Sequence, residues 1–470
     1  MLMADPFPHL SAPPPVQLAG RRVLVLGLGD TGLAVAGWVA RMRGLPCIAD
    51  TRAHPPRVDD VRSVLPDAEL RFGPFSPELL EGVDLLVPSP GLSVREPVVQ
   101  QAIARGIPIA GEIELFAWAL ASGHRGRVIA VTGTNGKTTV AALTGHLLRA
   151  AGIDCEVAGN IGPPALSALA ARIDAGRPPA AWVLELSSYQ LETTWTLAPD
   201  AAAMLNLSED HLDRYSGLAD YGAAKQRIFA GAKVQVLNRD DPRSLAMAVA
   251  DARQVRFGLD QPVGPQDFGL VDIHGAQWIA RGPEPLVATH ELQIHGAHNA
   301  ANAMAAAALA SAAGARDAAI AAGLRSFRGL AHRLERVETI GRVDYFDDSK
   351  GTNVGATLAA LRGLGRPVVL ILGGEGKGQD FTPLSAAVAA CATRVLLIGR
   401  DAPTISAALA GSGVPLEQCA TLEQAVRAAA RAARPGDAVL LSPACASFDM
   451  FRDYRERGER FAQAVRELAQ

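Results

Sequence analysis

One pattern recurs along the chain: a short apolar run, a loop of glycine and polar residues, and a helical segment. Short apolar runs bounded by such loops are typical of strands buried in a parallel sheet. Strands that alternate with helices predict an α/β fold. The pattern predicts strands at residues 22–26, 48–50, 85–87, 107–109, 128–131, 182–188, 201–207, 336–337, 343–346, 368–372, 395–398 and 438–441, and helices at 33–43, 140–148, 221–229 and 296–313 and from 354 onward.

Composition places the chain among soluble globular proteins, with 49% hydrophobic and 20% charged residues. The net charge of -3 gives no indication of a nucleic-acid or membrane surface, so we expect neither partner. The longest apolar runs contain glycine, proline or charge and are too short to span a bilayer. Five scattered cysteines without a CxxC motif are typical of free thiols in a reducing cytoplasm.

Length and breaks in the pattern predict three domains, because a domain holds roughly 150 residues. The proline-rich start lacks the basic segment and apolar core of a secretory signal, so we expect a disordered leader. We predict this leader at 1–18, an N-terminal Rossmann-like parallel sheet at 19–116, a central P-loop ATPase-like domain at 117–329 and a C-terminal Rossmann-like domain at 330–470.

Residues 133–139, with the sequence GTNGKTT, lie between a predicted strand and a predicted helix. A glycine loop at such a junction wraps backbone N–H groups around an oxyanion. Lys137 adds a charge for the β- and γ-phosphates, and Thr138 offers a hydroxyl to Mg²⁺. The common P-loop pattern has a further glycine where Val131 stands, and the alternative is an ordinary strand–helix turn. The Gly-Lys-Thr-Thr run favours the phosphate site.

A second glycine loop, residues 27–32 with the sequence GLGDTG, follows the first predicted strand. Asp50 ends the next strand, eighteen residues beyond Gly32. This order and spacing match the dinucleotide-binding fingerprint. The loop predicts that a diphosphate group binds near a helix N-terminus, but it does not indicate that the ligand is NAD. The alternative is a tight turn with no ligand.

Two polar side chains follow apolar runs of the central domain. Glu185 lies near the end of a strand beside the phosphate loop, where a carboxylate is well placed for Mg²⁺; the alternative is an exposed edge-strand glutamate. His211 lies among acids in the loop after the next strand, where a solvated histidine is the commoner case.

Lysine is rare in this chain. Of 45 basic residues only five are lysines: Lys137, Lys225, Lys233, Lys350 and Lys377. A retained lysine indicates a position that needs a compact amine able to lose its proton. The alternative is a leftover surface lysine, and we assign Lys233 to that class.

Laid side by side, these loops resemble the Mur ligase family, whose members add amino acids to the peptidoglycan precursor. Residues 133–139 are similar to its phosphate loop, and 184–191 and 206–215 to its metal segments. Residues 348–353 and 441–449 resemble the branch that adds D-glutamate, although Gly351 stands where some members have alanine. The similarity runs from about Val23 to Phe461.

The resemblance implies a cytoplasmic, ATP-dependent amide ligase, acting as a monomer, whose three domains bind the UDP-sugar, ATP and the amino acid. The γ-phosphoryl group of ATP would pass to the carboxylate of UDP-N-acetylmuramoyl-L-alanine. The amine of D-glutamate would attack the acyl phosphate and release phosphate. Two Mg²⁺ ions would take part, one held by Thr138 and Glu185 and one by His211. Lys225 would carry a carbamate formed from CO₂ and serve as a metal ligand.

The resemblance also implies a role for each remaining candidate. ATP would be bound by the phosphate loop and by further residues of the centre and the third domain: Gly133, Thr134, Asn135, Gly136, Lys137, Thr138, Thr139, Asn299, Arg333 and, at the ribose, Asp348. Lys350 would contact the reacting end of the substrate, and Asn160 its muramoyl portion. The UDP moiety would be bound by Asp30, Thr31, Asp50, Thr51 and Arg52, and D-glutamate by Thr352, Lys377, Ser447, Phe448 and Tyr454.

Three other functions compete with this interpretation. An NAD-dependent oxidoreductase built on residues 27–50 leaves the phosphate loop, Glu185 and His211 unexplained. A non-catalytic nucleotide switch built on Lys137 needs no third domain. Another Mur-type ligase or a folate polyglutamylating ligase would share the chemistry, but the segment around Ser447 and the first domain's fingerprint argue against the folate enzyme.

Overall fold

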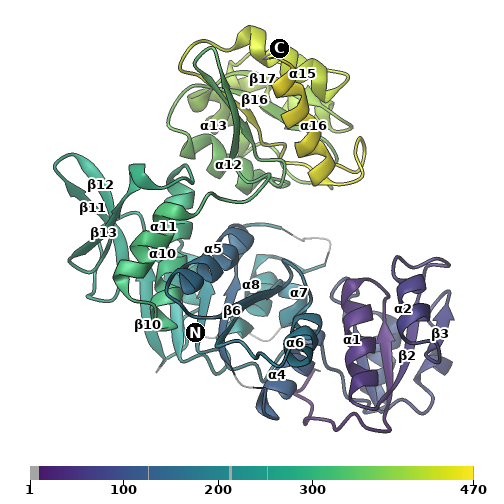
Figure 1. The fold of residues 1–470 in the computed structure, drawn as a ribbon. Helices are drawn as coiled ribbons and strands as arrows, with labels where there is room; N and C mark the ends of the chain where they lie inside the picture. Colours follow the sequence, from purple (N-terminus) through teal and green to yellow (C-terminus); the bar gives the residue numbers. More distant parts are fainter. Residues whose placement is uncertain (1–9, 125, 211–213, 251, 469–470) are drawn as a thin grey trace. The chain divides into compact units, whose positions relative to one another are not determined.

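The computed structural model describes residues 10–124, 126–210, 214–250 and 252–468. It contains three β-sheets with helices between their strands, which confirms the predicted α/β class (Figure 1). The described residues form two compact units. The first holds the chain up to Gly269 with Ala280–Leu286 and Met304–Gly323, and the second holds Leu270–Ile279, Val287–Ala303 and the chain from Leu324 onward. The exact domain bounds given above stay a prediction.

The N-terminal sheet has four parallel strands in the order β3-β2-β1-β4. Strand β1, which lies between β2 and β4, is buried throughout residues 23–26, as expected for an apolar run with parallel neighbours on both sides. Leu10 and Leu18, from the stretch predicted as a leader, are buried in the same core. The elements are β1 (Arg22–Leu26), α1 (Asp30–Arg41), β2 (Leu45–Asp50), α2 (Val58–Val64), β3 (Glu69–Phe72), η1 (Pro77–Leu80), β4 (Leu85–Pro88) and α3 (Pro97–Ala104).

The strand predicted at 107–109 is wrong. The segment forms one isolated bridge, between Leu86 and Ile109. Pro108 has no N–H group with which to extend a ladder of hydrogen bonds. Only its carbonyl takes part, accepting from the N–H of Leu86 at 2.9 Å.

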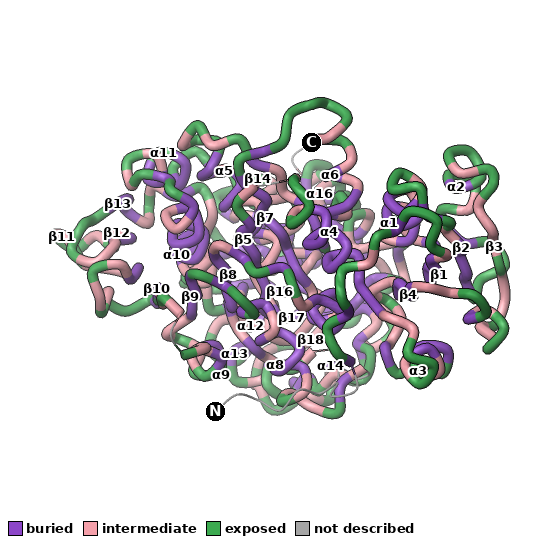
Figure 2. The backbone as a smooth tube through the Cα atoms, turned by 90° about the horizontal axis from the view of Figure 1, so that it is seen from below, coloured by how far each residue is buried: buried purple, intermediate pink, exposed green. Residues whose placement is uncertain are grey.

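The central sheet has nine strands in the order β13-β12-β11-β10-β9-β8-β5-β7-β6. Strand β5 pairs in parallel with β7 and β8, so the carboxyl ends of all three lie at one edge of the sheet. Figure 2 shows β5 and β7 in the colour of buried residues. The strands are β5 (Arg127–Thr132), β6 (Cys155–Gly159), β7 (Ala181–Glu185), β8 (Ala201–Met204), β9 (Val234–Asn238), β10 (Arg253–Phe257), β11 (Phe268–Ile273), β12 (Ala276–Arg281) and β13 (Glu284–Ala288).

Helices connect these strands, and two of the strands end earlier than predicted. Strand β7 stops at Glu185 because Ser187 caps the next helix, its hydroxyl accepting from the N–H of Gln190. Strand β8 stops at Met204, ahead of the loop that packs on the phosphate loop. The helices are α4 (Glu112–Ala121), α5 (Lys137–Ala150), α6 (Ala165–Asp174), α7 (Ser188–Leu191), α8 (Leu218–Gln226), η2 (Arg227–Phe229), α9 (Pro242–Ala246), η3 (Thr289–Glu291), α10 (Ala297–Ala312) and α11 (Asp317–Ser326).

The C-terminal sheet has six strands in the order β14-β15-β19-β16-β17-β18, with β14 antiparallel at one edge. Side chains of β16 alternate between two apolar clusters, with Leu370 in one and Val369 in the other, so both faces of the sheet are covered. The elements are β14 (Glu335–Ile340), β15 (Val343–Asp347), α12 (Val354–Gly363), β16 (Val368–Gly373), α13 (Leu384–Cys391), β17 (Ala392–Ile398), α14 (Ala402–Leu409), η4 (Ala410–Ser412), β18 (Leu416–Gln418), α15 (Leu422–Ala432), β19 (Ala438–Leu441) and α16 (Tyr454–Glu467).

The described helices include none that is both long enough and apolar enough to cross a membrane. All five cysteines are free thiols, as predicted.

Candidate active site

The phosphate loop joins β5 to α5, as the sequence predicts. Gly136 caps the helix with φ of +84°, a left-handed conformation that favours glycine. Lys137, Thr138 and Thr139 form the first helical turn, at the positive end of the helix dipole. Such a turn is suited to bind an anion.

The loop after β8 holds the phosphate loop in place. The carbonyl of Asn206 accepts from the N–H of Thr134 at 2.9 Å, and its side-chain oxygen accepts from the N–H of Asn135 at 2.8 Å. The hydroxyl of Thr134 donates to the carbonyl of Ser208 at 3.2 Å. A Cβ atom at Gly133 would lie 2.9 Å from the Cβ of Leu205, at the start of the loop after β8, so glycine allows this close packing.

Two lysines converge on the loop. Lys137 Nζ donates to the carbonyls of Gly133 and Thr134, both at 2.9 Å. Lys225 Nζ, from α8, donates to the carbonyl of Gly133 at 2.8 Å and lies 4.7 Å from the centre of the Tyr221 ring. The Lys225 side chain is fully buried. Burial, with the nearby charge of Lys137, lowers the pKa of Lys225 well below its usual value, which favours a neutral amine.

Glu185 ends β7 beside the phosphate loop and is 1% exposed, so the alternative of an exposed edge-strand glutamate is wrong. Its Oε1 accepts from Asn160 Nδ2 at 2.6 Å, whereas Oε2 has no hydrogen-bond partner among the described residues. A buried carboxylate oxygen without a partner is costly. The oxygen and the Thr138 hydroxyl are the hard ligands that Mg²⁺ prefers, so these residues fit the ion. His211 lies outside the described residues, and its role stays a prediction.

Arg214 connects the central domain to the N-terminal sheet. Its guanidinium makes a bidentate ion pair with buried Glu192, at 2.6 and 3.1 Å. It also donates to the carbonyls of Pro90 and Leu92, in the loop after β4, at 3.1 and 2.8 Å. Tyr215 donates to the same carboxylate at 2.6 Å.

The fingerprint loop after β1 folds as predicted, with a difference at Asp50. The carboxylate accepts from the N–H of Leu28 at 2.7 Å and from the Arg52 guanidinium at 2.7 and 2.8 Å. Burial alone would raise the pKa of Asp50, but these hydrogen bonds outweigh it and lower the pKa to about 2. The oxidoreductase interpretation needs this carboxylate for a ribose hydroxyl, yet here it supports the loop.

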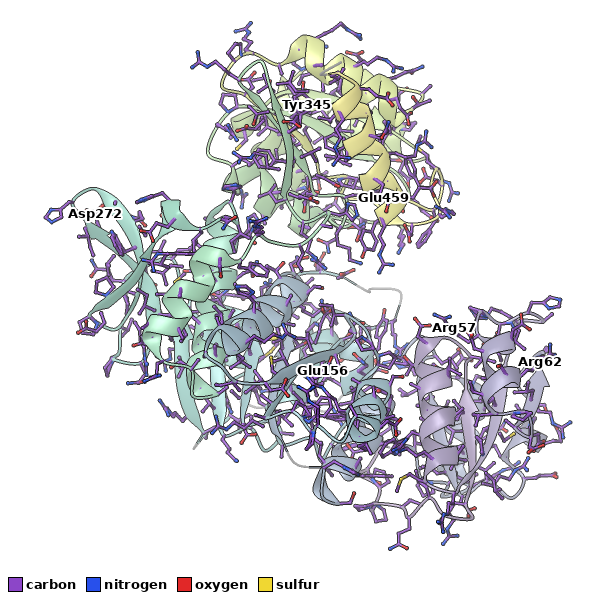
Figure 3. The ribbon with its side chains drawn as sticks, in the orientation of Figure 1. Arg57, Arg62, Glu156, Asp272, Tyr345 and Glu459 are labelled. Atoms are coloured by element: carbon purple, nitrogen blue, oxygen red, sulfur yellow. The ribbon has the colours of Figure 1, made fainter. Side chains whose placement is uncertain are left out.

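The other residues predicted to bind UDP lie at the same edge. Asp30 opens α1 and accepts from Arg57 at 2.6 Å (Figure 3 labels Arg57). Thr31 is half-buried in the first turn of α1, and Thr51 and Arg52 are exposed just after β2. Ser89 donates to the carbonyl of Gly27 at 3.1 Å, which places the loop after β4 beside the glycine loop.

The second unit holds the other candidates. Asp348 follows β15 and accepts from the hydroxyl of Ser442, after β19, at 2.7 Å. Burial raises the pKa of Asp348 to about 7. Asn299, on α10, is buried, and its side-chain amide donates to the carbonyl of His295 at 2.8 Å. The side-chain oxygen of Asn299 accepts from the amide of Asn302 at 3.1 Å. Its amide therefore already has partners within its own segment.

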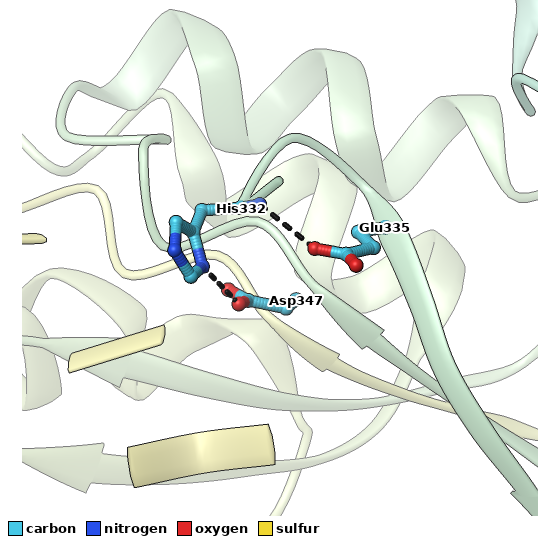
Figure 4. Close-up of side chains that lie close together, drawn as sticks. All are labelled: His332, Glu335 and Asp347. Carbon is cyan, nitrogen blue, oxygen red and sulfur yellow. Dashed lines mark hydrogen bonds and ion pairs between the residues drawn. The ribbon is translucent and has the colours of Figure 1, made fainter. Parts of the chain in front are cut away.

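His332, Glu335 and Asp347 form a cluster beside this loop, drawn in Figure 4. His332 Nδ1 lies 2.6 Å from Asp347 Oδ2, and the backbone N–H of His332 donates to Glu335 at 3.0 Å. The hydrogen bond to Asp347 raises the pKa of His332. Asp347 bonds the imidazole and Glu335 bonds the backbone of the same residue, so the two carboxylates fix the position of His332.

Aromatic rings position two lysines. Lys350 Nζ lies 4.0 Å from the centre of the Tyr454 ring, which packs nearly perpendicular to the His332 ring, with the ring centres 6.2 Å apart. Lys377 Nζ lies 5.9 Å from the centre of the Phe448 ring, which is 64% exposed. A large exposed apolar ring beside a cation is typical of a binding surface.

Thr352 and Ser447, the other residues predicted to bind D-glutamate, lie on the loops after β15 and β19. Ser447 is buried and Thr352 half-buried. These two strands are neighbours and parallel, so both loops leave the same edge of the sheet. The central strand β16 has β19 on one side and β17 on the other, and ligands of open α/β sheets bind where strand order reverses in this way.

Comparison with known proteins decides the family. The Mur ligase MurD-like N-terminal domain matches residues 21–111, the Mur ligase middle domain 131–310, and the Mur ligase glutamate ligase domain 332–445. The chain is 52% identical to the UDP-N-acetylmuramoylalanine--D-glutamate ligase of Nitrosospira multiformis, over 96% of this chain and 97% of that one. It is 53% identical to the protein of the same name from Thiobacillus denitrificans, over 97% and 98%.

The chain belongs to the Mur ligase family.

Solved structures agree on the Mur ligase fold. The UDP-N-acetylmuramate-alanine ligase of Thermotoga maritima is similar with a TM-score of 0.59 at 18% identity, covering 95% of this chain and 99% of that one. A pseudomurein peptide ligase type C from Methanothermus fervidus gives 0.57 at 17% identity, covering 96% and 100%. The predicted three-domain α/β architecture is therefore confirmed.

Sequence reasoning missed one residue that holds this Mur ligase's C-terminal loops. Arg457, in α16, is fully buried and donates to the hydroxyl and carbonyl of Ser349 at 2.9 and 2.8 Å. It also donates to the carbonyls of Cys445 and Ala446 at 3.1 and 3.3 Å. It thus joins the loop that carries Lys350 to the loop that carries Ser447. A signal for it was faint: an arginine one residue before a glycine inside an amphipathic helix.

Proposed function

We propose that this Mur ligase joins D-glutamate to UDP-N-acetylmuramoyl-L-alanine in the cytoplasm, with conversion of ATP to ADP and phosphate. The observation that carries the proposal is the identity of 52–53%, over nearly the whole chain, with proteins of that name. The phosphate loop, the buried Glu185 and the aromatic-flanked Lys377 supply groups that each step of this reaction requires.

The first step activates the substrate. The carboxylate of the alanyl group attacks the γ-phosphorus of ATP, and the bond from this phosphorus to the oxygen that bridges to the β-phosphate breaks. ADP departs, and the substrate becomes an acyl phosphate. The reacting groups are anions, so the site must supply positive charge and backbone donors. Lys137 and the N–H groups of the first turn of α5 hold the phosphates. Mg²⁺, when bound, offsets the charge on the phosphates and the carboxylate.

Thr138 and Glu185 would hold one ion, and His211 would hold a second. Lys225 would complete the second site as a carbamate: its neutral amine forms an N–C bond to CO₂ and releases one proton. Two observations support this role. The amine is buried, and its lowered pKa favours the unprotonated form, which the reaction with CO₂ requires.

The second step forms the amide. The amine of D-glutamate attacks the acyl carbon, the C–O bond to the phosphate breaks, and the amine loses a proton. Lys377, Thr352, Ser447, Phe448 and Tyr454 would bind the amino acid. Lys350 would contact the reacting end of the UDP-sugar substrate.

The test is phosphate release from ATP in the presence of UDP-N-acetylmuramoyl-L-alanine, with D-glutamate compared against L-glutamate and other amino acids. We expect turnover that needs both the nucleotide-sugar and D-glutamate. Equal turnover with L-glutamate would count against the assignment.

A further inference from the structure

Helix α4 begins with two buried glutamates, Glu112 and Glu114, which are 2% and 0% exposed. The helix leads from the N-terminal sheet into the central domain. Moving a carboxylate out of water is costly unless hydrogen bonds compensate. The reaction proposed above uses neither side chain, so both require an explanation.

Glu112 caps a different helix. Its Oε1 accepts from the N–H of Leu166, in the first turn of α6, at 2.7 Å. Helix α6 has Pro164 at its N-cap position and no side-chain cap of its own. A carboxylate is the favoured partner for such a helix start, because it satisfies N–H groups and faces the positive end of the helix dipole. The cap of α6 therefore comes from 54 residues earlier in the chain.

The segment before α6 is the loop that carries Asn160. Its N-terminal end is fixed by Glu185: the N–H of Asn160 donates to the Glu185 carbonyl at 2.8 Å, and Asn160 Nδ2 donates to Oε1 at 2.6 Å. The loop closes on itself, with the N–H of Gly159 bonded to the carbonyl of Pro163 at 2.9 Å. Its C-terminal end runs directly into the turn capped by Glu112.

We propose that Glu112 is a positioning residue for the nucleotide-sugar: by capping α6 it holds the 159–164 loop so that Asn160 faces the substrate beside Glu185. The inference rests on the proposed function. Glu112 Oε2 has no hydrogen-bond partner among the described residues, whereas Oε1 bonds the start of α6.

Glu114 provides the matched comparison. Its Oε2 accepts from the N–H groups of Trp195 and Thr196 at 2.6 and 3.0 Å, and its Oε1 accepts from the Thr196 hydroxyl at 2.7 Å. It is as buried as Glu112, lies one half-turn away on the same helix, and fixes a segment that carries no proposed ligand contact. Removing the Glu114 carboxylate should lower stability without weakening the binding of one substrate more than that of the others.

The experiment compares Glu112→Ala, Glu112→Gln and Glu114→Ala in the full chain. Calorimetry gives the Kd for UDP-N-acetylmuramoyl-L-alanine, and kinetics give the KM for each substrate. We expect Glu112→Ala to weaken nucleotide-sugar binding ~10-fold, the size of a lost helix cap, and to leave the KM for ATP within about twofold. Glu112→Gln keeps an oxygen acceptor and should restore binding. Glu114→Ala should lower Tm without a selective change in nucleotide-sugar binding.

A double variant tests the route through Asn160. If Glu112 acts through this loop, Glu112→Ala should add little to the loss caused by Asn160→Ala. If Glu112→Ala does not fold, Glu112→Asp, which withdraws the carboxyl by one methylene, should show the same selective weakening. Unchanged nucleotide-sugar binding, or an equal rise of all three KM values, overturns the inference. Calorimetry needs no turnover, so this result is independent of whether D-glutamate proves to be the amino acid.

Discussion

Lys137 and Lys225 donate to the same oxygen, the backbone carbonyl of Gly133, at 2.9 and 2.8 Å. Two ammonium groups that bond the same oxygen are close enough to repel each other, and the Lys225 side chain is fully buried. The pair is relieved if Lys225 is neutral, which is the state that reacts with CO₂. The residue would then change from a repelled cation to an anion that attracts a metal.

The first prediction is that Lys225→Arg is nearly inactive. A guanidinium stays charged and cannot form a carbamate, so it would oppose Mg²⁺. Lys225→Ala should also be poor, yet partly restored by a short-chain carboxylic acid that supplies the missing anion. The same acid should do nothing for Lys137→Ala, where a cation is lost. The measurement is the rate of phosphate release with and without acid, and a fully active Lys225→Arg protein would refute the carbamate.

The second prediction concerns Glu185, whose Oε2 we assign to Mg²⁺. Glu185→Gln should lower kcat on the order of 100-fold, since it removes a charged group at the phosphoryl-transfer site. It should also shift the Mg²⁺ dependence of activity to higher concentration. The matched control is Glu156→Gln on the neighbouring strand β6, where Glu156 pairs with Arg172 at 2.8 Å (Figure 3). An unchanged Mg²⁺ titration for Glu185→Gln would exclude it as a ligand.

The third prediction is a pH dependence of stability set by Glu112. Burial raises the pKa of Glu112 to about 7 from a usual value of 4.5. A carboxyl whose folded-state pKa is raised contributes stability below pH 4.5, and this contribution is lost as the pH rises to about 7. The loss is on the order of 3 kcal/mol. Glu112→Gln does not titrate, so its Tm relative to the parent should increase between pH 5 and pH 8. A constant difference would contradict the raised pKa.

The fourth prediction separates a buried ion pair from an exposed one. Arg214→Ala leaves Glu192 buried without its cation, which typically costs about 3–5 kcal/mol. Lys233→Ala removes an exposed pair with Asp200, at 2.7 Å, and should cost less than about 1 kcal/mol. Thermal unfolding of the two variants gives the comparison. Equal Tm shifts would mean that the Arg214 bridge between the N-terminal sheet and the central domain stabilises the fold no more than the exposed pair does.

Local patterns made part of this site predictable. The phosphate loop and the fingerprint loop each lie within one strand–loop–helix unit, so their sequence and their geometry come from the same few residues. The strand at 107–109 failed because an apolar pattern does not show that Pro108 lacks the donor that a ladder needs.

Contacts between distant segments were not predictable from the pattern alone. Lys225 meets the Gly133 carbonyl across 92 positions, and Arg214 meets the Leu92 carbonyl across 122. Nothing in the spacing of Glu112 indicates that it caps α6. Such partners are fixed by how the sheets and helices pack. The family resemblance supplied the role of Lys225, whereas Arg457 and Glu112 emerged only from the structure.

The central claim is that the substrate carboxylate is phosphorylated and then captured by D-glutamate. It is tested most directly with UDP-N-acetylmuramoyl-L-alanine labelled with ¹⁸O in its carboxylate, incubated with ATP and D-glutamate. The account predicts that the released phosphate carries one ¹⁸O atom, that the amide product retains the other, and that L-glutamate gives neither. Unlabelled phosphate, or labelled phosphate formed equally with L-glutamate, would contradict it.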